Sequence, residues 1–152
     1  MSSFEKLLKS YQERINRVLE NILPRDDSIL SSAMRYSVLN GGKRLRPILI
    51  YLVGELSDKD SNNLDILAGA IELVHCYSLI HDDLPSMDDD ELRRGNPTTH
   101  KKFDEATAIL AGDALQPLAF ELISTINTSA DNKIKMIKSL SLIHISEPTR
   151  LR

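Results

Sequence analysis

Apolar and polar residues recur along the chain with the three- and four-residue spacing of helix faces. The pattern is clearest near the start, where the apolar positions are Phe4, Leu7, Leu8, Tyr11, Ile15, Val18, Leu19 and Ile22. Ser2 and Glu5 have the spacing of a capping box, and Pro24 disfavours continuation of a helix. The sequence therefore predicts an amphipathic helix between these two signals.

The same periodicity and further end signals predict the other helices. The second helix covers about 28–39 and ends at Asn40-Gly41-Gly42, and the third has Pro47 in its first turn. Two longer helices cover about 62–82 and 104–126. Asp131 caps a last helix that runs through Leu140. The segment 62–82 is apolar around most of its circumference, which is typical of a central helix. The sequence shows no alternating run bounded by hairpin turns and no internal repeat. The predicted class is all-α.

Composition narrows the function classes. A length of 152 residues with 41% hydrophobic content predicts one domain with a real core. The net charge of −3 and the interspersed signs argue against a broad basic surface for nucleic acid. A single cysteine, Cys76, excludes an internal disulfide framework, and the first residues lack the features of a secretory signal, so we expect a cytoplasmic protein. No apolar run reaches the roughly 20 residues that span a bilayer, so no membrane span is expected.

One segment concentrates negative charge. Six of the ten residues 82–91 are acidic: Asp82, Asp83, Asp88, Asp89, Asp90 and Glu91. Neighbouring carboxylates repel one another by about 1 kcal/mol per pair even in water, so a folded chain tolerates them best around a divalent cation. Arg93 and Arg94 follow directly. The segment therefore predicts a site for metal and phosphate, and a solvated acidic loop is the alternative.

Helical geometry relates the acidic segment to the helix before it. His75 and Asp82 are seven residues apart and lie within roughly 20° of one another on a regular helix, so we expect them to line one groove. Asp82 and Asp88 diverge by roughly 120° on a continuous helix. Pro85 disfavours continuity, and we predict that the helix ends or bulges at 83–86 and brings the two carboxylates close enough to share Mg²⁺.

Magnesium suits this site better than calcium. Mg²⁺ is usually held by one or two carboxylates together with substrate phosphates and waters, which implies a diphosphate ligand. A calcium loop starting at Asp88 would need glycine where Arg93 stands, and a loop starting at Asp83 would place Pro85 at a ligand position.

Basic residues offer a second anion site. Lys43, Arg44 and Arg46 lie at a predicted helix N-terminus, where backbone N–H groups and the helix dipole also favour a phosphate. Arginine supplies bidentate geometry and lysine a mobile charge. The Gly-Gly-Lys-Arg string lacks the spacing of a nucleotide-binding P-loop, so a solvated basic cluster stays an alternative. For His75 the alternative is a buried core histidine.

Four strings carry a family resemblance. They are residues 41–47 (GGKRLRP), 77–90 (YSLIHDDLPSMDDD), 92–95 (LRRG) and 109–115 (ILAGDAL). With them the chain resembles the trans-isoprenyl diphosphate synthases, especially their bacterial farnesyl diphosphate synthase type, over about residues 4–140. The resemblance implies a bundle of helices around a central cavity, the isoprenoid synthase fold, of which this chain is the N-terminal half. It also implies a Mg²⁺-dependent trans-prenyltransferase and, for the complete protein, a homodimer.

The resemblance also implies residue roles. Asp82, Asp88 and, less directly, Asp83 bind Mg²⁺ and Arg93 contacts the allylic diphosphate, while Lys43, Arg46, His75 and Arg94 hold isopentenyl diphosphate. The allylic substrate is dimethylallyl or geranyl diphosphate, and condensation to farnesyl diphosphate needs no protein nucleophile. Tyr77 is the implied cavity floor that limits chain length. Helical geometry places Tyr77 roughly 140° from Asp82 and places Ser78 nearer that face, so spacing alone does not put Tyr77 in the cavity.

The chain departs from this family in two respects. The second aspartate-rich motif of the family is absent, so we expect this polypeptide alone to have negligible synthase activity. Residues 141–152 do not resemble the family and look like translated sequencing-adapter read-through, which leaves 1–140 as the family domain. Alternatives are a geranylgeranyl diphosphate synthase, a terpene cyclase, a simple metal-binding acidic protein, and a non-catalytic helical module that binds diphosphates or a homologous subunit.

Overall fold

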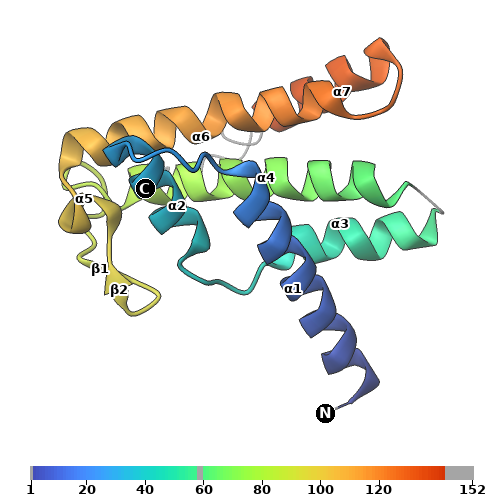
Figure 1. The fold of residues 1–152 in the computed structure, drawn as a ribbon, viewed down its shortest axis with the longest axis horizontal. Coiled ribbons are helices and arrows are strands. Elements are labelled where there is room, and N and C mark those ends of the chain that lie inside the picture. Colours follow the sequence, from blue (N-terminus) through green and yellow to red (C-terminus); the bar gives the residue numbers. More distant parts are fainter. Residues whose placement is uncertain (1, 58–59, 143–152) are drawn as a thin grey trace.

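The computed structural model describes residues 2–57 and 60–142. Within these residues the chain forms seven helices and one hairpin of two short strands (Figure 1). The helices are α1 (Ser3–Ile22), α2 (Ile29–Leu39), α3 (Leu45–Leu56), α4 (Ser61–Asp82), α5 (Thr99–Lys102), α6 (Glu105–Thr125) and α7 (Ala130–Ser141), and the strands are β1 (Leu92–Arg93) and β2 (Asn96–Pro97). The helical class is confirmed. The tail 143–152 lies outside the described residues, so the domain boundary after residue 140 stays a prediction.

Local signals set most helix ends. The Glu5 N–H donates to Ser2 Oγ at 3.2 Å and the Ser2 N–H donates to Glu5 Oε2 at 2.6 Å, which is the predicted capping box of α1. The prediction for α7 was wrong in its cap: Ser129, not Asp131, accepts from the Asn132 N–H at 3.3 Å, because the helix begins two residues earlier. Asp131 lies in the first turn, where its charge still favours the helix dipole.

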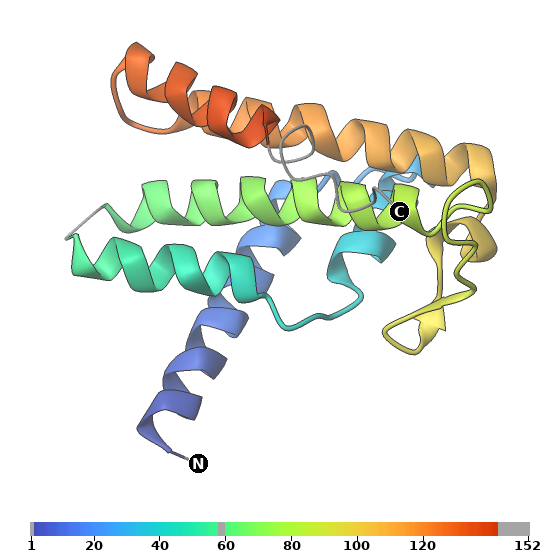
Figure 2. The same cartoon turned by 180° about the vertical axis from the view of Figure 1, so that it is seen from behind.

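Helix α4 is the centre of the bundle, as its apolar circumference predicted. Figures 1 and 2 show α6 alongside α4 on one side, α3 on the other, and α1 crossing them. A close approach between α4 and α6 depends on Gly112, because a Cβ there would overlap the ring of His81. The side chains that α4 buries include Leu73, Val74, Cys76 and Ile80.

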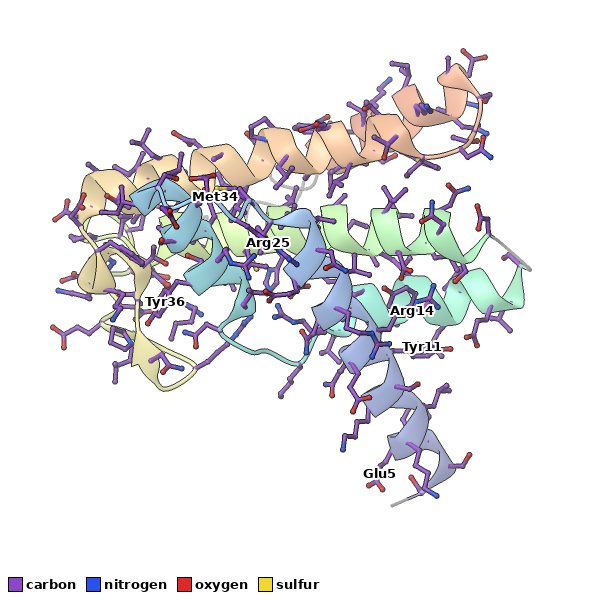
Figure 3. All side chains as sticks on the ribbon, in the orientation of Figure 1. Glu5, Tyr11, Arg14, Arg25, Met34 and Tyr36 are labelled. Carbon is purple, nitrogen blue, oxygen red and sulfur yellow. The ribbon has the colours of Figure 1, made fainter. Side chains whose placement is uncertain are left out.

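The first helix is anchored where it crosses the bundle. Figure 3 shows Glu5 near the projecting end of α1, and Tyr11 and Arg14 near α3. The Tyr11 ring stacks on that of Tyr51, with 5.4 Å between centroids. Arg14 Nε donates to Asp65 Oδ1 at 2.8 Å, and the Arg14 guanidinium lies 4.4 Å from the centroid of the Tyr51 ring. This contact joins α1 to α3 and α4 at one end of the bundle.

The hairpin and α5 were missed in the sequence. Each strand has two residues, which is too short to show an alternating pattern. The strands pair antiparallel, with Arg93 opposite Asn96, and are joined by Arg94 and Gly95 at φ values of 56° and 81°. Tyr36 Oη donates to the Pro97 carbonyl at 2.8 Å, which docks the hairpin on α2.

Two helices, α4 and α6, are long and apolar enough to cross a membrane by length and composition. They pack against one another in this fold, and core helices of globular proteins meet the same criterion. The expected lack of a membrane span is therefore not confirmed and stays a prediction.

Candidate functional site

The acidic loop folds back on the end of α4. The helix ends at Asp82, and the Asp88 N–H then donates to the Asp82 carbonyl at 2.9 Å. The Met87 N–H donates to the Leu84 carbonyl at 2.8 Å and tightens the turn around Pro85. The predicted break at 83–86 is confirmed, and it returns the backbone of Asp88 to that of Asp82.

Asp83 points elsewhere. It is 3% exposed, and Arg93 Nε donates to both of its oxygens, at 2.8 and 2.9 Å. Arg93 Nη2 donates to Asp83 again and to Asp90 Oδ2, the latter at 3.1 Å. Burial raises the pKa of Asp83 above its usual value, while the Arg93 hydrogen bonds oppose that rise. Asp83 thus orients Arg93, and its predicted role as a Mg²⁺ ligand stays a prediction.

The donor set fits magnesium with a phosphate ligand. Among residues 2–57 and 60–142, no group of three or more histidine, cysteine, aspartate or glutamate side chains is arranged to hold a metal ion. Mg²⁺ takes oxygen ligands and is often held by one or two carboxylates, with phosphates and waters completing its coordination shell. Asp82 and Asp88 are the residues that could hold it.

A basic pocket of about 410 Å³ lies between the loop before α3, helix α4 and the hairpin. Its lining includes every residue predicted to contact substrate: Lys43, Arg46, His75, Arg93 and Arg94. These residues come from three separate parts of the chain, so the pocket exists only in the folded protein. The fold therefore concentrates positive charge around one cavity of a size that suits a small anion.

Two contacts shape this basic pocket. Arg46 Nη1 lies 3.4 Å from His75 Nε2. Arg94 donates to the Gly41 carbonyl, and its guanidinium packs so closely on Gly42 that a Cβ there would lie 2.6 Å from Arg94 Cζ. Gly42 has a φ of 126°, so both its conformation and this contact favour glycine.

Arg44 corrects the interpretation of the basic cluster. The sequence placed it with Lys43 and Arg46 as a phosphate contact, but it is 3% exposed. Its Nη1 donates to Glu72 Oε1 at 2.8 Å, because a buried guanidinium needs a counter-charge. Sequence reasoning missed Glu72. The available signal was that Glu72 is the one carboxylate in the apolar stretch 66–80.

A second pocket of about 410 Å³ lies between α4 and α6. Its lining residues are Tyr77, Ser78, His81, Asp82, Leu84, Met87 and Ile109. Tyr77 therefore shares a cavity with Asp82, a position that helical spacing alone did not predict for Tyr77. Ser78 lines the same cavity. The Tyr77 ring meets that of His81 edge-on at 4.8 Å, and His81 Nε2 lies 3.1 Å from the Ile109 carbonyl.

The predicted common groove for His75 and Asp82 was wrong. His75 lines the basic pocket and Asp82 lines the pocket of Tyr77. The two residues do share a helix face, but seven residues of helix separate them by roughly 10 Å along the axis, so one face serves two cavities.

Comparison with known proteins assigns the chain. The sequence pattern of the polyprenyl synthetase family matches residues 27–146. The chain belongs to the polyprenyl synthetase family. A farnesyl diphosphate synthase of Haemophilus influenzae is 51% identical over 145 residues, which are 93% of this chain and 49% of that protein. A geranylgeranyl pyrophosphate synthase 4 of Arabidopsis thaliana is 44% identical over 139 residues, which are 91% of this chain and 37% of that protein.

Solved structures of the polyprenyl synthetase family agree. A geranyltransferase from Legionella pneumophila superposes with a TM-score of 0.81 at 48% identity, over 86% of this chain and 47% of that one. The isoprenoid synthase fold is thus confirmed. The chain spans about half the length of the relatives it matches.

His75 gives the basic pocket of this family member a pH dependence. Burial lowers the pKa of His75 from its ordinary value, and the positive charge of Arg46 lowers it further. As the pH falls, His75 therefore takes up its proton at a higher pH in the unfolded chain than in the folded one. The stability that neutral His75 contributes is complete above about pH 6.5 and declines as the pH falls.

We expect the His75 ring to titrate below the midpoint of the urea-unfolded chain in a pH series followed by NMR. The His75→Gln variant assigns the signal. Saturating inorganic pyrophosphate should raise the midpoint, since an anion in the pocket favours the imidazolium. A midpoint at or above that of the unfolded chain would contradict the lowered pKa.

Proposed function

We propose that this chain forms the part of a Mg²⁺-dependent prenyltransferase that binds isopentenyl diphosphate and an allylic diphosphate, dimethylallyl or geranyl, for condensation to farnesyl diphosphate. One observation carries the proposal: Arg93, one of the five predicted contacts that line the basic pocket, bonds to Asp83 in the turn that brings the backbone of Asp88 back to that of Asp82. The names of the farnesyl diphosphate synthases that resemble the chain support it.

The residues divide between two diphosphates. Lys43, Arg46, His75 and Arg94 line the basic pocket and would hold isopentenyl diphosphate. Asp82 and Asp88 would hold Mg²⁺ against the allylic diphosphate. Arg93 is tethered by Asp83 and also lines the basic pocket, so it lies between the two ligands.

The chemistry requires charge stabilisation and positioning. The C–O bond of the allylic diphosphate breaks and its electron pair leaves with the diphosphate; the isopentenyl double bond then attacks the allylic carbon and a proton is lost. When bound, Mg²⁺ would neutralise charge on the departing diphosphate. Arg93 stabilises the same charge, and the cations of the basic pocket orient the second substrate. The cavity that Leu84, Met87 and Ile109 line would protect the allylic carbocation from water.

Tyr77 is proposed as the floor that limits product length, because its ring and Asp82 line one cavity. A diphosphate held at Asp82 would direct its prenyl chain toward that ring. A geranylgeranyl product is the second candidate, supported by the Arabidopsis thaliana relative of that name.

The activity is proposed for a chain that also carries the other half of the family fold. Helix α3 leaves an apolar stripe exposed, formed by Leu45, Leu49, Val53 and Leu56 at 60%, 60%, 61% and 88% exposure. Half a bundle exposes such faces. A homodimer and a cytoplasmic location complete the proposal.

Calorimetric titration of the chain tests the basic pocket. Isopentenyl diphosphate and inorganic pyrophosphate should both bind, and Lys43→Gln or Arg46→Gln should weaken each by about 10- to 100-fold, the value of one charge-assisted hydrogen bond. Lys9→Gln is the matched control, since Lys9 is an exposed cation on α1 that pairs with Glu13.

Equal affinities for the three variants would contradict the proposal. The Arg93→Gln/Arg94→Gln double variant separates the alternatives: a simple metal-binding protein would keep its metal affinity and show no diphosphate binding to lose. Loss of isopentenyl diphosphate binding in the Lys43→Gln and Arg46→Gln variants also argues for condensation over cyclisation, because cyclisation needs no second diphosphate.

A further inference from the structure

The loop between α2 and α3 and the first turn of α3 carry Lys43 and Arg46, two cations of the basic pocket, but have little local support. Helix α3 begins without a side-chain cap, and its N-cap residue is Arg44 in the left-handed conformation, with a φ of 53°. The loop's own backbone contributes a hydrogen bond from Gly41 to the Leu39 carbonyl, at 2.7 Å. A loop of this kind needs contacts from outside to keep one conformation.

The hairpin holds the first part of the loop, through Arg94 on the Gly41 carbonyl and Asn96 on Asn40. The guanidinium of Arg44 holds the second part from beneath the pocket. Besides Glu72 on α4, Arg44 bonds to α1 and α2: its Nε donates to Asn16 Oδ1 at 3.0 Å, and its Nη2 donates to the Val38 carbonyl at 2.7 Å. Each of the three nitrogens thus reaches a different helix. The side chains of the Arg44–Glu72 pair are 1% and 2% exposed, so the arrangement is enclosed by the bundle.

The cations one residue before and two residues after Arg44 face the pocket. Lys43 and Arg46 line it, and the Lys43 carbonyl accepts from Gln12 Nε2 at 3.0 Å. Because Arg44 is fixed between them, the backbone that presents both cations is fixed as well. The planar fork of arginine suits this task, since one rigid group sets three directions.

Arg44 also neutralises a negative charge at the basic pocket. Glu72 is the one carboxylate among the residues that line the basic pocket. An anionic ligand there would be repelled by an unpaired carboxylate. The ion pair with Arg44 neutralises Glu72, so the pocket keeps the positive potential of Lys43, Arg46 and Arg94.

We propose that Arg44 is a positioning residue of the basic pocket: its guanidinium, which borders the pocket but is 1% exposed, orders the loop 40–44 and the start of α3 so that Lys43 and Arg46 meet a diphosphate, and it neutralises Glu72. The identity of the ligand rests on the proposed function. The ordering of the loop by Arg44 does not.

The Arg44→Met/Glu72→Met double variant of the full 152-residue chain separates positioning from folding. Removing both charges leaves no buried ion unpaired, so the urea midpoint should stay near that of the wild type. The bonds to Asn16 and Val38 are nevertheless gone. We expect hydrogen exchange of the Gly41 and Ile48 amides, which donate to the Leu39 and Arg44 carbonyls, to accelerate about tenfold or more. Pyrophosphate binding should weaken by about tenfold or more, because the cations lose their preorganisation.

Asn16→Ala provides a milder test. Asn16 is exposed, so this variant folds, and it should loosen the same loop by a smaller factor. Arg14→Met is the control: Arg14 also joins α1 to α4, through Asp65, but does not line the pocket. It should lower the urea midpoint without changing loop exchange or pyrophosphate affinity.

Wild-type loop exchange in the Arg44→Met/Glu72→Met variant overturns the inference, and if that variant does not fold, wild-type loop exchange in Asn16→Ala does so. Wild-type pyrophosphate affinity with a loosened loop would also overturn it, since the loop order would then not serve the ligand. Absence of pyrophosphate binding by the wild type contradicts the proposed function instead, and loop exchange still decides the role of Arg44.

Discussion

Arg44→Met alone is expected to lower the free energy of unfolding by about 3–5 kcal/mol, since it leaves the Glu72 carboxylate buried and unpaired. Glu72 is 2% exposed and its Oε1 accepts from Arg44 Nη1 at 2.8 Å. The variant therefore retains a charge that has neither water nor a partner. Glu72→Met should cost less, because Arg44 keeps the Asn16 and Val38 oxygens as acceptors.

Urea unfolding of the wild type, both single variants and the double variant gives a complete thermodynamic cycle. We expect the double variant to be more stable than Arg44→Met and close to the wild type, because similar apolar volume replaces the pair. Strictly additive losses would show that the two side chains do not interact, which the 2.8 Å contact contradicts.

Changing Asp82 and Asp88 together to asparagine should reduce Mg²⁺-dependent condensation by about 10²- to 10³-fold or more, measured in a chain that carries both halves of the family fold. Amides keep the size of the side chains and remove the charge that Mg²⁺ requires. In the 152-residue chain the same change should abolish the increase in geranyl diphosphate affinity on adding Mg²⁺.

Asp89→Asn is the matched control for this pair. Asp89 lies in the same acidic loop, is exposed, and has a left-handed backbone conformation that asparagine also adopts. Pyrophosphate binding to the basic pocket without Mg²⁺ should be unchanged in every variant. Comparable losses from Asp89→Asn and from the double change would remove Asp82 and Asp88 from their proposed role.

The sequence predicted what local chemistry determines. The capping box at Ser2 and Glu5, the stop at Asn40 and the break near Pro85 each depend on residues within a few positions of one another, and each is present in the structure. The central place of α4 followed from the same local pattern, because a helix that is apolar on most sides must be surrounded.

The predictions that were wrong concern contacts between residues far apart in the chain. Neighbouring cations look alike in a sequence, and what turns Arg44 inward is Glu72, 28 residues away. Asp83 and Asp82 likewise look alike in the sequence, and only the folded chain shows that Arg93 on the hairpin donates to Asp83. Separate pockets for His75 and Asp82 likewise follow from which helices cover each turn of α4, and no spacing rule contains that information.

The described non-glycine residues with left-handed φ values are Arg44, Asp89 and Arg94, and all three belong to the site loops. Such a conformation costs roughly 1–2 kcal/mol for a residue with a Cβ, and asparagine or glycine would adopt it more easily. Selection for heat tolerance alone would therefore replace Arg94 at the hairpin turn and lose a cation of the basic pocket. Laboratory evolution toward a higher melting temperature should replace Arg94 early but retain Arg44, which pairs with the buried Glu72, so affinity for pyrophosphate should be measured beside the melting temperature.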